Sequence, residues 1–109
     1  MSANPKLKDA LTDQLFEAIL LLQTKEDCYQ FFEDICTVGE LKAMAQRLEV
    51  ARMLHHGHIY DHIVERTGAS TATISRVKRC LHYGADGYKL VLPRIDKEPI
   101  AGDNRTNGV

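Results

Sequence analysis

The chain has 109 residues, of which 44% are hydrophobic and 27% charged, and its formal net charge is −1. This length allows one domain with a modest core, and the longest purely apolar run, Ala18 to Leu22, is far too short to cross a bilayer. Because the N-terminus lacks a signal-peptide core, we expect a cytoplasmic protein with no membrane partner.

The three cysteines, Cys28, Cys36 and Cys80, are odd in number and show no paired Cys-x-x-Cys spacing. This pattern argues against a disulfide framework and against a zinc ribbon. Reduced, half-buried thiols are the expected state of all three.

Two helices are expected in the first part of the chain, after a flexible segment over residues 1–8. Apolar residues recur at spacings of three and four and predict an amphipathic helix over about residues 9–23. Thr24 and Asp27 resemble a capping box for a second helix, over about residues 25–36.

A better capping box, Thr37 with Glu40, is predicted to open a third helix, which Gly57 ends. The apolar stripe of this helix is predicted to consist of Leu41, Met44, Ala45, Leu48, Ala51 and Leu54. Since no strand signal or internal repeat is present, the fold class is expected to be all-α.

Residues 59–82 have the pattern of a helix-turn-helix. A short helix runs into Gly68, which can adopt the positive φ of a tight turn, and Ala69 is small enough to lie where two helices cross. Ser70 can cap a second helix that begins at about Thr71. One side of that helix, predicted to pack, carries Ile74, Val77 and Leu81.

The other side of this helix carries hydroxyls and positive charge, which is typical of a helix that enters the DNA major groove. The predicted base-reading residues are Thr71, Ala72, Thr73 and Ser75. The predicted phosphate contacts are Tyr60, Ser70, Arg76, Lys78 and Arg79. The alternative interpretation is an ordinary helical hairpin with a solvated basic face.

The charge is segregated along the chain, although the net charge is small. Residues 1–40 hold three lysines against eight acidic residues, whereas residues 41–95 hold nine basic residues against four acidic ones. Such segregation predicts an acidic body and a basic end that can bind double-stranded DNA.

A last helix is predicted to start at Asp86 or Gly87, and it holds Tyr88, Val91, Leu92 and Ile95. The polar, unpatterned residues 96–109 are expected to be a disordered tail. We therefore expect a single helical domain over residues 9–95.

Three segments together resemble the bacterial YerC/YecD branch of the Trp repressor superfamily: Thr37-x-x-Glu40, QRLEVARML over residues 46–54, and TGASTATISRVKRCL over residues 67–81. The resemblance covers roughly residues 13–95. It implies an interlocked homodimer, in which the first three helices of both subunits build one core and two helix-turn-helix heads read a pseudo-palindromic operator.

In the Trp repressor a co-repressor lies between two arginines and near a serine of the reading helix. The resemblance places Arg47 and Arg76 at the positions of those arginines, and Thr37 near the amino end of the ligand. Val77 stands where the tryptophan binder has a glycine beside the indole, and Cys80 stands where it has the serine. Tryptophan is therefore not expected to bind, and another co-repressor stays open, as does a structural or phosphate-contacting role for both arginines.

The five histidines form the one cluster that could suggest metal chemistry: His55, His56, His58, His62 and His82. His58 and His62 could share a helix face, but His55 and His56 suit the negative end of the preceding helix. We predict neither a metal site nor a cofactor. Because no nucleophile is placed beside a positioned base, we also predict no enzyme.

Two functions remain open from the sequence. The first is a sequence-specific transcription regulator, most simply a repressor, that reads a pseudo-palindromic operator. The second is a protein-interaction adapter that keeps the fold without specific DNA reading.

Overall fold

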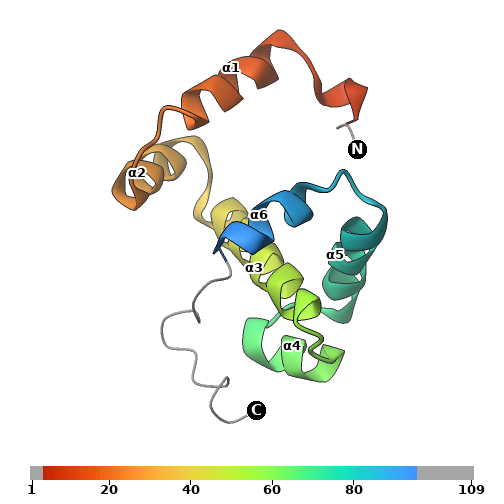
Figure 1. Cartoon of the computed structure of the whole chain (residues 1–109). Helices are drawn as coiled ribbons and strands as arrows, with labels where there is room; N and C mark the ends of the chain where they lie inside the picture. Colours follow the sequence, from red (N-terminus) through yellow and green to blue (C-terminus); the bar gives the residue numbers. More distant parts are fainter. Residues whose placement is uncertain (1–3, 96–109) are drawn as a thin grey trace. The chain divides into compact units, whose positions relative to one another are not determined.

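The computed structural model describes residues 4–95, so the predicted tail, residues 96–109, lies outside the described residues. All regular structure in this part of the chain is helical, as the sequence predicts (Figure 1). After a short 3-10 helix at Pro5–Leu7, the elements are α1 (Ala10–Ile19), α2 (Lys25–Ile35), α3 (Val38–His55), α4 (Tyr60–Thr67), α5 (Thr71–Tyr83) and α6 (Gly87–Ile95). The chain divides into two compact units, one up to Gln46 and one from Arg47.

α1 begins where the sequence predicts but ends four residues earlier. The Asp9 side chain accepts a hydrogen bond from the Thr12 amide and caps the start of the helix. The predicted end at residue 23 is wrong, because the next helix's cap uses this segment: Asp27 Oδ2 accepts from the Gln23 amide at 3.0 Å and from the Thr24 amide at 3.3 Å. Thr24 is therefore extended, and the helix has to end before it.

Both predicted capping boxes are present. Thr24 Oγ1 accepts from the Asp27 amide at 3.0 Å, which completes the box at α2. At α3 the Thr37 amide donates to Glu40 Oε1 at 2.8 Å, and the Glu40 amide donates to Thr37 Oγ1 at 3.1 Å. These bonds satisfy amide groups that a helix leaves unpaired at its start.

The predicted apolar stripe of α3 is fully buried only at Ala51. Leu41 and Leu54 are half-buried, whereas Met44, Ala45 and Leu48 are exposed in the single chain. The difference has a physical reason, since the buried cluster of the described residues lies entirely within the second unit. Its members are Val50, Ala51, Met53, Ile63, Ala69, Ile74, Val77 and Leu92.

Arg52 is the one charged side chain buried among the described residues, with 7% exposure. Its Nε donates to Glu49 Oε1 at 2.8 Å, and its Nη2 donates to Glu49 Oε2 at 3.2 Å. A two-point bond of this kind compensates a buried guanidinium for the water it loses. It also fixes the charge within the last turns of α3, beside the core.

α6 starts at Gly87, as predicted, and contributes Leu92 to the core. The preceding turn contains Asp86 at a positive φ of 67°. Lys89 lies 3.4 Å from the Asp86 carboxylate, one turn along. α6 packs against α5, which in turn packs against α4.

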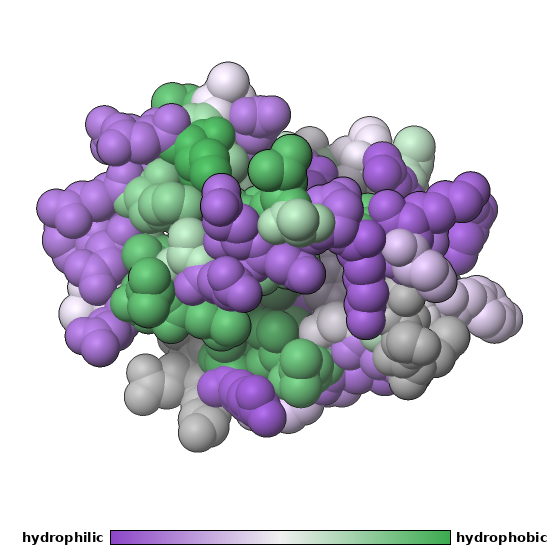
Figure 2. Space-filling model, turned by 90° about the horizontal axis from the view of Figure 1, so that it is seen from above, coloured by the Kyte–Doolittle hydropathy of each residue, from purple (hydrophilic) through white to green (hydrophobic). Residues whose placement is uncertain are grey.

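The first unit has no core of its own. None of residues 4–46 is buried, and several large apolar side chains are open to solvent in the single chain. The most exposed of these are Leu11, Leu20, Leu21 and Val38, at 79%, 82%, 77% and 73%. Figure 2 shows large apolar side chains at the surface, beside polar ones.

Over residues 4–95, no helix combines the length and the apolar character that a membrane span requires. The three thiols are free, as predicted. The expected half-burial is confirmed for Cys36 but wrong for Cys28 and Cys80, which are exposed. Cys28 lies on a helix without a buried side chain, and Cys80 lies beside, not on, the apolar ridge of α5.

Candidate nucleic-acid interface

The turn between α4 and α5 has the predicted geometry. Gly68 ends α4 in the left-handed conformation, with φ 72° and ψ 5°, and its amide donates to the Val64 carbonyl. Ala69 is 2% exposed and lies in the core cluster, so a small residue is needed at the crossing. The Ser70 side chain accepts from the Thr73 amide at 3.1 Å and caps α5.

Thr67 is a turn residue that the sequence pattern did not single out. Its hydroxyl donates to the Ile63 carbonyl at 2.7 Å and accepts from the Ala69 amide at 3.1 Å. One side chain thereby ties the last turn of α4 to the first residue after the glycine. A threonine directly before a predicted C-cap glycine is the signal that could have found it.

α5 separates into the two predicted sides. Ile74 and Val77 are 0% and 1% exposed, and Leu81 is half-buried and packed on the core. The side chains outside this ridge that are exposed to solvent include Thr71, Ala72, Ser75, Arg76, Lys78 and Arg79. The first turn of α5 holds no acidic residue. The positive end of the helix dipole and the basic side chains therefore both attract an anion such as a phosphate group.

One predicted base-reading residue is less available than the others. Thr73 is half-buried, and its hydroxyl accepts a hydrogen bond from Ser70 Oγ at 3.1 Å. Ser70 itself is exposed but is engaged twice in the helix cap. Thr71, Ala72 and Ser75 lie on the open side of α5.

Tyr60 lies at the start of α4 and reaches across to α5. Its hydroxyl is 3.4 Å from Ser75 Oγ, and Lys78 Nζ lies 5.8 Å from the centre of its ring. A lysine over an aromatic face is held by the negative charge of that face. The three side chains therefore form a polar group that joins the two helices of the motif at its exposed edge.

Three of the predicted effector residues, Arg47, Arg76 and Cys80, act electrostatically on Tyr88 of α6, a residue outside the predicted effector pocket. Burial raises the pKa of the Tyr88 hydroxyl, the nearby Cys80 raises this pKa further, and Arg47 and Arg76 act in the opposite direction. Tyr88 and Cys80 also line one cavity of about 330 Å³. Val77 is 1% exposed in the core cluster, against which Tyr88 also packs.

Thr37, the remaining predicted effector residue, lies in the first unit, where its hydroxyl and its amide are both bonded to Glu40. Its structural role is thus the capping of α3. Tyr88 could not be assigned to the effector residues from the sequence, because it lies on α6 and no local pattern connects it to them.

Among the histidines, the structure brings His58 and His62 together. Their Nδ1 atoms lie 3.1 Å apart, and both side chains are half-buried. His55 is the last residue of α3, and His56 follows it. Within residues 4–95, no group of three or more histidine, cysteine or acidic side chains is arranged to hold a metal ion.

The fold and this exposed face define a helix-turn-helix protein on an all-helical scaffold, the class to which many DNA-binding regulators belong. Comparison with known proteins identifies the family. The family model for the Trp repressor protein matches residues 10–96. The chain therefore belongs to the Trp repressor family, a family of DNA-binding transcription regulators.

The relatives agree with this assignment. YerC of Bacillus subtilis (strain 168) is 58% identical over 90 residues, which are 83% of this chain and 86% of YerC. A crystal structure of a TrpR-like protein from Eubacterium eligens ATCC 27750 matches with a TM-score of 0.83 and 50% identity, over 89% of this chain and 100% of that one. A Staphylococcus aureus structure described as a candidate Trp repressor matches with a TM-score of 0.81 and 52% identity, over 87% and 95%.

Proposed function

We propose that this protein is a transcription regulator that binds a specific, pseudo-palindromic DNA sequence as a homodimer and acts in the cytoplasm. The observation that carries the proposal is the open face of α5. Its short hydroxyl-bearing side chains and three cations are exposed, while its apolar ridge is fixed in the core. Short residues allow close approach to base edges, and the cations neutralise phosphates.

The homodimer is supported by the first unit. Two helices without a single buried residue cannot form a stable fold by themselves, because burial of apolar surface is the main force that stabilises a domain. A second copy that covers these side chains supplies the missing core. The two-fold axis of such a dimer relates the two copies of α5 to each other.

The decisive test is selection of bound duplexes from a random DNA pool, followed by affinity measurements on the enriched site. We expect a two-fold-related sequence. Arg79→Ala should weaken binding to all duplexes and reduce the salt slope by about one. Thr71→Val should change the preferred base and cost about 1–3 kcal/mol of discrimination at one position.

Lys42→Ala is the matched control for Arg79→Ala, since Lys42 is an exposed cation of α3 outside the motif. It should leave the affinity for the enriched site unchanged. If no sequence is enriched, and if Arg79→Ala and Lys42→Ala behave alike, the regulator proposal fails and the adapter takes its place.

We further propose that tryptophan is not the effector. The branched Val77 side chain is held in the core at the position that the resemblance assigns to an indole neighbour. The melting temperature should be the same with and without millimolar L-tryptophan, and a rise that saturates with concentration would contradict this.

A further inference from the structure

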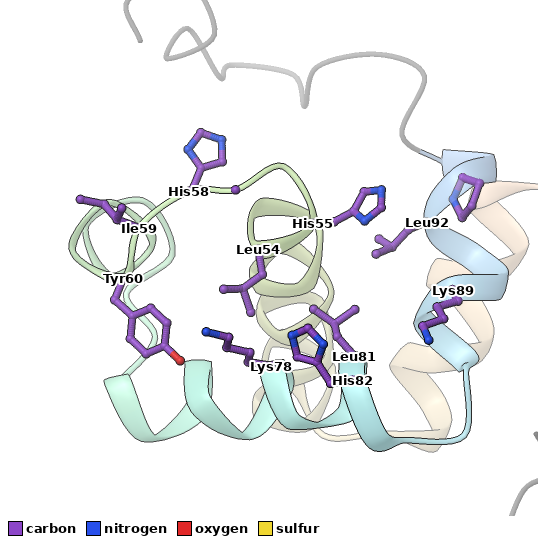
Figure 3. Close-up of a pocket in the computed structure, with 12 residues that line it drawn as sticks. Leu54, His55, His58, Ile59, Tyr60, Lys78, Leu81, His82, Lys89 and Leu92 are labelled. Atoms are coloured by element: carbon purple, nitrogen blue, oxygen red, sulfur yellow. The ribbon is translucent and has the colours of Figure 1, made fainter.

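A groove lies within the second unit, where the end of α3 meets α4, α5 and α6, and Lys78 is the residue that it shares with the open face of α5 (Figure 3). Its volume is about 900 Å³, within the range of small-molecule sites. None of the five predicted effector residues lines it, and neither does Tyr88. It is therefore a different site from the predicted effector pocket.

The floor of the groove is apolar. Leu54, Leu81 and Leu92 converge on it from three different helices. Leu92 is 1% exposed, and the other two leucines are half-buried and packed on the core. Ile59 and Pro93 extend the apolar lining.

The rim of the groove is basic and aromatic. Lys78 lies on one side of the leucines and Lys89 on the other (Figure 3). Three histidines, His55, His58 and His82, also line the groove, and none of its lining residues is acidic. Lys89 also lies 3.4 Å from the Asp86 carboxylate, which does not line the groove. The charge of the lining residues is thus complementary to an anion, while the floor is complementary to a hydrocarbon body.

We propose that this groove binds a small carboxylate with an apolar body, and that the bound molecule weakens DNA binding. The second part rests on the proposed function, because Tyr60 and Lys78 line the groove and are also two of the proposed phosphate contacts. A carboxylate that engages Lys78 withdraws this cation from a DNA phosphate.

Octanoate is a suitable probe, and octan-1-ol is its uncharged match. Titration followed by amide chemical shifts should move the signals of groove residues, such as Leu54, Leu81 and Lys89. The alcohol should bind about tenfold more weakly, because it lacks the charge-assisted contact. Equal affinities, or shifts confined to residues 10–46, would overturn the proposal by placing the probe on the exposed apolar side chains of α1 and α2.

Lys89→Glu tests the rim, and Lys42→Glu is the matched charge change away from it. Lys89→Glu should weaken octanoate binding about tenfold, whereas Lys42→Glu should leave it unchanged. Circular dichroism checks that both variants are folded. If both variants bind as the wild type does, the groove is not the site.

The link to DNA is tested on the enriched duplex, with sodium acetate at equal concentration as the salt control. Octanoate at a concentration that saturates the wild type should weaken DNA binding several-fold in the wild type. The same concentration should have a much smaller effect in Lys89→Glu, because this variant binds octanoate more weakly. An unchanged DNA affinity would overturn the competition. The two proposals fail separately, since octanoate binding is measured without DNA and site enrichment is measured without octanoate.

Discussion

Gly84 shows how a single residue fixes the exit from the reading helix. Its amide donates to the Cys80 carbonyl and closes the last turn of α5. A Cβ built at Gly84 would overlap the same Cys80 carbonyl oxygen, which is backbone and cannot rotate away. The need for glycine here comes from this close approach, since Gly84 has a negative φ of −86°.

Gly84→Ala should therefore lower the free energy of unfolding by about 1–3 kcal/mol, since the end of α5 has to shift. Gly87→Ala is the matched control, because nothing lies within 4 Å of a Cβ at the start of α6. The control should be neutral or slightly stabilising, as alanine is the better helix former. Urea unfolding of both variants measures the difference, and equal stabilities would contradict the steric explanation.

At the scale of elements, the capping boxes link stability to pH. Backbone hydrogen bonds, from the Gln23 amide to Asp27 and from the Thr37 amide to Glu40, hold the pKa of each carboxyl below its ordinary value. A group with a lowered pKa stabilises the fold above its unfolded pKa, and this stabilisation is lost as the pH falls through the folded value.

The free energy of unfolding should thus decline as the pH is lowered below about 4.5, toward the folded pKa values. In the double variant Asp27→Asn and Glu40→Gln the decline should be shallower, since two of the linked protons are removed. Glu33→Gln, an exposed side chain of α2 outside the box, serves as the control. Parallel curves for the double variant and the control would show that the caps do not carry this dependence.

Local signals predicted the elements well, because their causes are local. A capping box needs a hydroxyl and a carboxylate three residues apart, as in Thr37 and Glu40. Ser70 was predicted as a cap from its hydroxyl before the helix, and Gly68 from the positive φ that the turn needs. The end of α1 was not predicted correctly, because the Asp27 carboxylate accepts hydrogen bonds from the Gln23 and Thr24 amides, and this segment is therefore not helical.

Non-local contacts account for what the sequence could not predict. The effect of Arg47 on the pKa of Tyr88 depends on how α6 packs, and no spacing rule connects residues 41 positions apart. The same applies to the groove, whose lining comes from four helices and the loop before α4. The open face of α5 was predictable, because one helix alone contains both the ridge and the exposed side.

At the scale of the whole molecule, the exposed apolar side chains of the first unit predict the oligomeric state. Leu11→Asp should shift the protein toward monomer in sedimentation and lower its melting temperature. Its side chain is 79% exposed in the single chain, so the change would be harmless in a monomer. Gln14→Asp adds the same charge on the same helix and should leave the dimer intact. A wild type that sediments as a folded monomer contradicts the proposal.

Because none of residues 4–46 is buried in the single chain, the amount of active protein depends steeply on its concentration. If these helices become ordered only when two chains associate, folding and dimerisation are one second-order process. The concentration of the dimer then rises with the square of the monomer concentration while the protein is scarce. A cell could then silence such a protein by dilution alone, for example through growth and division, without any small molecule.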